Sequence, residues 1–372
     1  DSILWVGGPG GLGFQAMAEI LCGEVNPSGR TVDTYYADFT LDAAQQNFGE
    51  YQYANSSEIE LTGQREGEPY NPNYLEYEEG IYMGYRFYET AWYEKEQAQE
   101  GSGDDWYNAW RSSEDGRGTG VVYPFGHGLS YTEFSQEITG VSEENGEIRV
   151  DVSVTNTGDI AGKDVVQIYY SAPYTDYDRE NSIEKSYINL IGFEKTGELE
   201  PGASETVTVT FDRDSMASYS YKHENEDGTT GCYILEEGDY TISLRKNAHE
   251  LYGETGCEEI YTVSETEYFE GDNLRSSDLE AQSVMNDDGS ITYTPADAES
   301  GYQAVSNKFD NMNSYMEEDA VTNLTRADWG SEPGEGTFPT SPNATGEIVY
   351  NEGPISDITV QITDREMSEA VL

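Results

Sequence analysis

The sequence predicts an α/β segment, then an all-β sandwich, then an extended and partly irregular tail. Residues 3–29 read as an apolar run, a glycine-rich turn and a helix, which is the pattern of a parallel βα unit. From about residue 136, short runs alternate apolar with polar residues between turn residues, as half-buried strands do. A chain of 372 residues can hold two or three domains. We place them at 1–135, 136–263 and 264–372.

Composition argues against several classes of partner. The chain has 73 acidic and 19 basic residues, which give a formal net charge of -54. Nucleic acid and anionic membranes would be repelled by such a surface, so we expect neither as a partner. No run of 18 apolar residues is present, so we expect no transmembrane helix. The first residues lack the charged segment and cleavage site of a signal peptide, and the compartment, cytoplasmic or secreted, stays open.

The cysteines and histidines predict no metal or cofactor site. Three cysteines are too few for a disulfide framework. Cys22 lies in an apolar helical segment, where we expect it to pack as a small hydrophobic residue. Cys232 and Cys257 either pair across two strands or stay separate. The three histidines are far apart in sequence, which argues against zinc. The 30 tyrosines suit either stacking on sugar rings or packing in a core.

The first element is expected to be a buried parallel strand at residues 3–6, Ile-Leu-Trp-Val. A helix follows from Phe14 to Cys22 and ends at Gly23. One βα unit cannot cover both faces of a parallel sheet, so we expect the chain to begin inside a domain.

The turn between them matches a dinucleotide fingerprint at Gly8, Gly10 and Gly13, with Asp33 twenty residues further on. Pro9 lies inside this turn and offers no backbone N–H to a pyrophosphate. We therefore favour glycines that let a helix pack onto a strand end over a nicotinamide site.

The next hundred residues mix strand, loop and helix signals. Residues 30–40 read as a strand, and 41–75 as polar surface loops. Aromatic residues at 82, 85 and 88 fit either a strand or one face of a helix. Arg86 is expected to pair with a carboxylate such as Glu78 or Glu79. Residues 94–120 read as a mobile insertion, with a lid over a sugar as the alternative.

An aromatic, glycine-punctuated stretch at residues 122–132, Val-Tyr-Pro-Phe-Gly-His-Gly-Leu-Ser-Tyr-Thr, predicts a domain junction. Gly126 and Gly128 flank His127 and allow backbone angles that residues with a Cβ avoid. We expect His127 to pack there as a structural residue.

After the junction the apolar residues follow a period of two. Five or more short strands fit into about 110 residues, which predicts an immunoglobulin-like or fibronectin type III-like sandwich. The expected strand residues are Ile148–Val154, Val166–Tyr170, Ile188–Gly192, Val207–Phe211 and Tyr240–Leu244.

Residues 264–345 are acidic and read as a linker, with a helix at 307–316 and a loop at 329–334. Residues 358–362 again have the pattern of a strand. Thr363 and Glu366 have the spacing of a capping box, so we expect a helix that the chain leaves unfinished.

Several motifs, taken together and in order over roughly residues 1–245, resemble glycoside hydrolase family 3, the β-glucosidase and β-xylosidase group. The matching stretches are Gly7–Gly13, Glu24–Arg30, Glu79–Tyr88, Tyr123–Thr132, Val154–Gly158, Ala161–Gly162, Val165–Gln167, Gly192–Phe193 and Glu200–Gly202.

The resemblance implies a three-part enzyme: a (β/α)8 barrel with an Asp nucleophile, an α/β sandwich with a Glu acid/base, and a fibronectin-like domain. This chain resembles the last part of the α/β sandwich plus the fibronectin-like domain, so we expect both catalytic carboxylates to lie outside it. Residues 323–329 with 336–339 resemble a connector of permuted members, in which the barrel follows. We therefore assign no catalytic, cofactor-binding or metal-binding residue, and expect the chain alone to be inactive.

Taken with this resemblance, the sequence leaves two function classes open. The first is part of a retaining β-glycosidase, which needs two carboxyl groups about 5–5.5 Å apart. Most of the 73 acidic residues are expected to be solvated surface charges, and their spacing selects no such pair. The second class is a non-catalytic module that binds carbohydrate or protein. A nucleotide-binding oxidoreductase would rest on the glycine spacing alone.

Overall fold

The computed structural model describes a set of segments that are separated by short and long gaps. The described residues are 3–10, 13–37, 51–52, 73–74, 79–112, 120–226, 228, 230–271, 273, 275–276, 283–285, 291–293 and 324–328. The first half holds α1 Gly13–Leu21, β1 Tyr35–Tyr36, β2 Tyr51–Gln52, β3 Asn73–Tyr74, α3 Tyr85–Ala98, α4 Ser102–Tyr107, η3 Ala109–Arg111, β4 Val121–Tyr123, β5 Phe134–Glu144, β6 Glu147–Asn156, β7 Val165–Ser171 and α5 Asp176–Asn181. The second half holds β8 Asn189–Lys195, β9 Ser204–Asp212, η4 Arg213–Met216, β10 Ser218–Glu224, β11 Thr230–Leu235, β12 Gly238–Arg245, β13 Glu258–Val263, β14 Glu267–Phe269, β15 Ser283–Met285, β16 Ile291–Tyr293 and η6 Arg326–Asp328.

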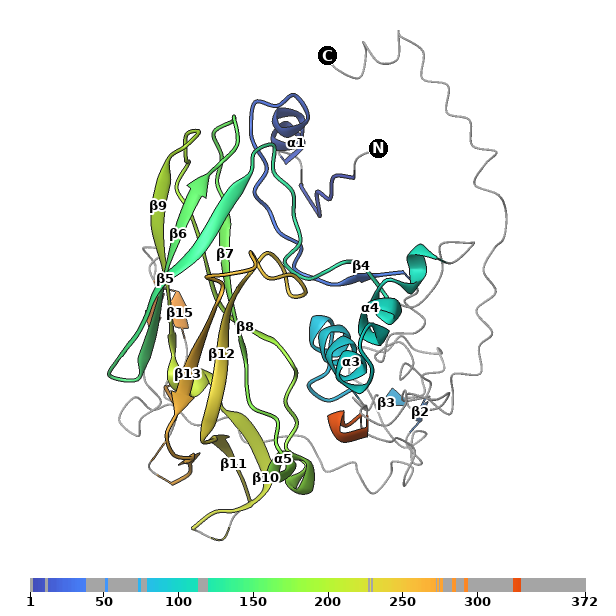
Figure 1. Cartoon of the computed structure of the whole chain (residues 1–372), viewed down its shortest axis with the longest axis vertical. Helices are drawn as coiled ribbons and strands as arrows, with labels where there is room; N and C mark the ends of the chain where they lie inside the picture. The colour runs from blue at the N-terminus through green and yellow to red at the C-terminus, as the bar shows by residue number, and fades with distance from the viewer. Residues whose placement is uncertain are drawn as a thin grey trace, which may run out of the picture.

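Antiparallel sheets form the long body on the left of Figure 1. One sheet has the strand order β5-β6-β9, and another has the order β13-β12-β7-β8. A third, with the order β10-β11-β14, extends the body at its lower end. The predicted sandwich is confirmed, and each of the five predicted strands lies within or beside an observed one.

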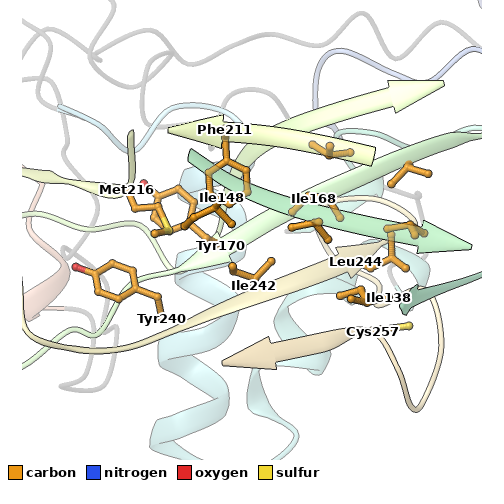
Figure 2. Close-up of a cluster of buried hydrophobic side chains, with 14 of the residues drawn as sticks. Ile138, Ile148, Ile168, Tyr170, Phe211, Met216, Tyr240, Ile242, Leu244 and Cys257 are labelled. Atoms are coloured by element: carbon orange, nitrogen blue, oxygen red, sulfur yellow. The ribbon is translucent and has the colours of Figure 1, made fainter. Parts of the chain in front are cut away.

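The sandwich core is mainly aliphatic and follows the alternation of the sequence. On β6, Ile148, Val150, Val152 and Val154 are each 0% exposed, and the residues between them face outward. Burying such a side chain contributes about 1.5–3 kcal/mol. Figure 2 shows how side chains from facing strands meet in this core. Its labelled members are Ile138, Ile148, Ile168, Tyr170, Phe211, Met216, Tyr240, Ile242, Leu244 and Cys257.

Helices α3 and α4 pack against each other and lie beside the sandwich, to its right in Figure 1. Of the two alternatives for the aromatic residues at 82, 85 and 88, the helix is the observed one, and it begins at Tyr85. Tyr82, Phe87 and Tyr88 are buried in a second apolar cluster that also holds Tyr107 and Leu324. None of the described helices has the length and apolar character needed to cross a membrane.

The predicted mobile insertion at 94–120 is wrong over residues 94–112. This stretch continues α3, forms α4 and ends in η3, and Tyr107 is only 3% exposed. The prediction failed because several charged residues here bond to other protein groups, as Glu94 does to Arg326 and Glu96 to the backbone of Gly101 and Gly103, while Tyr107 packs inward. Residues 113–119 lie outside the described part of the chain.

The N-terminal segment departs most from expectation. Residues 3–6 form no strand; Ile3 is 81% and Trp5 70% exposed. A strand needs a partner for its backbone groups, and no described strand pairs with these residues. Helix α1 forms as predicted but buries none of its residues, so Cys22, just beyond it, is exposed, not packed.

Other expectations are met only in part. Of the strand predicted at 30–40, residues 30–37 are described, and within them β1 is the strand that forms; it pairs with β4. Arg86 donates its Nε to Asn189 Oδ1 at 3.1 Å, and Glu78 lies outside the described residues.

Cys232 and Cys257 are both buried and unpaired. The elements predicted at 307–316, 329–334, 358–362 and 363–366 also lie outside the described residues, as does most of the loop at 41–75.

Candidate functional site at the domain junction

The stretch at 122–132 is held to residue 31 by backbone bonds. Thr31 N donates to His127 O at 2.7 Å, and Gly126 N donates to Thr31 O at 2.8 Å. The Thr31 hydroxyl donates to Pro124 O at 2.7 Å and accepts from His127 N at 3.0 Å. The junction stretch is thus fixed to a segment about ninety residues earlier in the chain.

The same stretch contacts the sandwich through β7. Gln167 Nε2 donates to Gly126 O at 3.1 Å and to Lys246 O at 2.8 Å. The Phe125 ring stacks on Tyr85 of α3 at a centroid distance of 4.7 Å. Phe125 O also accepts from Ala248 N at 2.9 Å. These contacts tie α3, the junction stretch and two sandwich segments together.

The two junction glycines are needed for different reasons. Gly126 has a φ of +81°, and a Cβ there would lie 2.2 Å from Gln167 Oε1. Gly128 has no left-handed φ, so the predicted conformational role holds only for Gly126. At Gly128 a Cβ would lie 2.2 Å from Gly29 O, and the reason is close approach of two backbones.

His127 is partly buried, and its ring lies 5.3 Å from that of Tyr123. Burial lowers the pKa of His127, and the neighbouring Arg30 charge lowers it further, while Glu250 raises it. The neutral ring is therefore the favoured form, which suits a packed residue.

Asp164 is a buried carboxylate shared between the N-terminal segment and the sandwich. Its side chain is 1% exposed and pairs with Arg30. It also accepts from Gln136 Nε2 at 2.8 Å and from the Tyr252 hydroxyl at 2.7 Å. Burial and the Asp164 charge raise the pKa of Tyr252, which keeps its proton on the phenol. All of these partners are protein groups.

Glu89 of α3 joins the helices to the loop after β12. The residue is 1% exposed. Its Oε1 accepts from the Tyr107 hydroxyl at 2.7 Å, and its Oε2 lies 2.8 Å from His249 Nδ1. The rings of Tyr107 and His249 stack at 3.9 Å, with Trp92 edge-on to His249 at 4.9 Å. Burial raises the pKa of Tyr107 well above its usual value.

Lys185 lies between two buried carboxylates. Its Nζ is 2.7 Å from Asp178 Oδ1, contacts the Glu236 carboxylate and donates to Pro173 O at 3.0 Å. Burial raises the pKa of Glu236 to about 7; the bond to Asp178 raises it too, and Lys185 opposes both. Such a pKa would suit a general acid. However, the three charged side chains are 2%, 0% and 9% exposed and contact one another, so a sugar has no access to them.

These buried carboxylates bind other protein groups and do not form an exposed catalytic pair. Retaining glycosidases need two carboxyl groups on either side of a bound glycosidic bond. Glu89, Asp164, Asp178 and Glu236 are all buried and all bonded to other side chains. Within the described segments, no group of three His, Cys, Asp or Glu residues could hold a metal ion.

Sequence reasoning found the junction stretch but missed these charged clusters. His249 and Lys185 each lie in a polar context that is typical of solvated surface, and the partners in these clusters are 7 to 160 residues apart in the sequence. The burial of Glu89 could have been predicted, because it lies among the aromatic residues on the buried face of α3.

Comparison with known proteins identifies the two domains. The glycosyl hydrolase family 3 C-terminal domain matches residues 1–85, and the fibronectin type III-like domain matches residues 164–248. Residues 1–85 are thus similar to the C-terminal domain of glycosyl hydrolase family 3. The second match confirms the fibronectin type III-like assignment of the sandwich, and together the two matches confirm the resemblance seen in the sequence.

Several relatives are named β-glucosidases, and two are named exo-α-(1→6)-L-arabinopyranosidases. The chain is 33% identical over 256 residues to β-glucosidase A of Butyrivibrio fibrisolvens, covering 64% of this chain and 24% of the relative. It is 28% identical to thermostable β-glucosidase B of Acetivibrio thermocellus, covering 63% and 24%. A solved β-glucosidase of Paenibacillus barengoltzii is 27% identical with a TM-score of 0.48, covering 76% of this chain and 26% of that one. The chain thus spans about a quarter of the length of the relatives it matches.

Proposed function

We propose that this chain is part of a β-glucosidase-like family 3 enzyme that hydrolyses terminal β-glycosidic bonds with retention of configuration. The observation that carries the proposal is that a match to the family 3 C-terminal domain is followed by a match to the fibronectin type III-like domain, in a chain several of whose relatives are named β-glucosidases. On this proposal the domains are 1–135, 136–263 and 264–372, and β-glucosides or β-xylosides are the substrates of the complete enzyme.

The proposal places the catalytic Asp and the acid/base Glu outside residues 1–372. The buried carboxylates of the junction support this, because each already contacts other protein groups. The chain then acts as a scaffold that holds other catalytic parts, and it is inactive alone. It needs no cofactor for this role.

A barrel domain is proposed to pack against this chain. Large apolar side chains near the N-terminus support such a contact, since exposed apolar patches mark interaction sites. Phe14 and Leu21 on α1 are 58% and 65% exposed, and Trp5 and Val32 are 70% and 85% exposed.

The test is hydrolysis of an aryl β-glucoside by the complete protein that contains this chain, followed by NMR of the first sugar released. The proposal predicts the β-anomer of glucose as the first product, and no turnover of the aryl α-glucoside. Parallel assay of an aryl β-xyloside distinguishes the two sugar classes. Release of the α-anomer first, or no turnover of either β-glycoside, would contradict it.

The alternative is a non-catalytic module that binds carbohydrate. It is favoured by exposed tyrosines on β10, where Tyr219 and Tyr221 are 48% and 54% exposed, because such rings can stack on sugar faces. Titration calorimetry with β-linked oligosaccharides tests it. Binding that Tyr219→Ala and Tyr221→Ala abolish would support the module, and no heat above dilution would remove it.

A further inference from the structure

The five residues 324–328 lie in a socket at the junction, and the side-chain hydrogen bonds that hold them there come from described residues at least 141 positions earlier in the chain. In Figure 1 this short orange-red turn lies beside α3 and near α5. Leu324 is 8% exposed and belongs to the apolar cluster of α3 and α4. Arg326 is 4% exposed, so its positive charge is buried in a chain whose net charge is strongly negative.

The Arg326 guanidinium is bound on several sides. Its Nε donates to Glu94 Oε1 at 2.6 Å, and its NH1 donates to Lys185 O at 2.9 Å. Its central carbon lies 4.3 Å from the Tyr174 ring centroid and 5.5 Å from that of Tyr93. Two hydrogen bonds in different directions and two aromatic rings suit the planar, forked guanidinium better than an ammonium.

A second carboxylate, Glu184, binds the backbone and side chain of the same segment. Glu184 Oε1 accepts from the Thr325 hydroxyl at 2.6 Å, and its Oε2 accepts from Arg326 N at 3.0 Å. The Tyr82 hydroxyl, from the turn before α3, also donates to Glu184. The carboxylate therefore connects the helical part, the loop after α5 and the 324–328 segment.

We infer that Glu94, Glu184, Tyr93, Tyr174 and the Lys185 carbonyl form an arginine-anchor socket, and that its occupant is the Leu324-Thr325-Arg326 segment of the same chain. The occupied socket joins α3 to the loop at 184–185 and so closes one side of the junction. It also fixes the place at which the chain leaves the junction after residue 328. On the proposed function, this would set where a following domain attaches; the socket itself needs no glycosidase activity.

The test is limited digestion of the whole 372-residue chain with trypsin, which cuts after Arg and Lys. Cleavage of a folded protein follows the population of locally open forms when opening is fast. We expect the Arg326–Ala327 bond to be cut at least about tenfold more slowly than the Arg111–Ser112 bond, because Arg111 is exposed. The fragments are identified by mass spectrometry.

Glu94→Gln removes the charge that pairs with Arg326 and keeps the shape of the side chain. We expect it to accelerate cleavage at Arg326 about tenfold or more, and to leave the rate at Arg111 unchanged. Glu100→Gln is the matched control, since it removes the same charge at an exposed position near the end of α3. Glu184→Gln provides a second variant with the same expected direction, and circular dichroism confirms that each variant is folded.

Two results would overturn the inference. One is cleavage at Arg326 that is as fast as at Arg111 in the unaltered chain, or equally fast in Glu94→Gln and Glu100→Gln. The other is protection that disappears on dilution, which would mean that a second copy supplies the segment. Neither result bears on the glycosidase proposal, because the digestion measures no activity.

Discussion

The sandwich core and the domain junction are built by different chemistry. The core between β6, β7, β9 and β12 consists mainly of aliphatic side chains, which alternate with outward-facing residues along β6 and β9. The junction holds buried charges, stacked rings and a glycine in a left-handed conformation. Apolar burial is non-directional, so the core tolerates substitutions that keep its volume. A buried ionic or hydrogen-bonded group that loses one partner is costly, so the stability of the junction depends on each of these contacts.

Truncation of a core side chain should have the largest effect. Ile242 on β12 is 0% exposed, and Ile242→Ala should lower the free energy of unfolding by about 2–5 kcal/mol. Ile260→Ala on the neighbouring β13 is the matched control, because Ile260 is 60% exposed and should change stability by less than about 0.5 kcal/mol. Urea unfolding followed by circular dichroism measures both. Equal losses would show that the sandwich is not the main apolar core.

Gly126→Ala should break the junction without touching the core. A Cβ at this φ of +81° costs about 1–2 kcal/mol, and the clash with Gln167 should add on the order of 1 kcal/mol or more. Gly146→Ala separates the two causes, since Gly146 has a φ of +83° and no atom within 4 Å of the added Cβ. Chemical denaturation compares the pair. If both variants lose the same stability, the close approach at Gly126 has no energetic role.

The buried Lys185 cluster should make stability depend on pH. The folded pKa of Glu236, about 7, lies above the usual 4.5, so its stabilising contribution is complete below about pH 4.5 and is lost as the pH rises through 7. Glu236→Gln is neutral at every pH and should remove this loss, a difference on the order of 1–3 kcal/mol between pH 6 and 8.5.

The exposed neighbour Glu237 supplies the control, as Glu237→Gln should retain the dependence on pH of the unaltered protein. Thermal melts at pH 6 and 8.5 give the comparison. A Glu236→Gln variant whose melting temperature falls over this range as steeply as that of the unaltered protein would contradict the assignment.

His127 should give a smaller effect of opposite sign. Because burial lowers its pKa in the folded state, its contribution is present above its usual pKa of 6.5 and is lost as the pH falls through the folded value. His127→Phe should lower the melting temperature at pH 7 by disturbing the packing beside Tyr123. The difference from the unaltered protein should shrink at pH 5. An unchanged melting temperature at pH 7 would argue against a packing role.

The contrast between the two regions also explains what the sequence could predict. The alternation on β6 is local, because four apolar residues at a spacing of two specify a half-buried strand by themselves. The junction at 122–132 was recognisable from its glycines and aromatic residues. Its partners were not, because Thr31 and Gln167 are separated from it by dozens of residues and carry no distinctive pattern.

The errors have related physical causes. Residues 3–6 are apolar enough for a buried strand, but pairing requires a neighbouring strand and burial requires a cover, neither of which a local pattern specifies. The many charged residues at 94–112 suggested a mobile segment, because few apolar residues mark the inward face of the helices there. Buried charges such as Lys185 and Arg326 look like ordinary surface residues until their distant partners are known.

The central claim is that this chain supplies the framework of a family 3 glycosidase and not its reacting carboxylates. The most direct measurement is turnover of an aryl β-glucoside by the purified 372-residue chain, whose folded state is first confirmed by circular dichroism. The account predicts no release of aryl alcohol above the buffer rate. Turnover at about 1 s⁻¹ or faster, which is typical of enzymes, would contradict it.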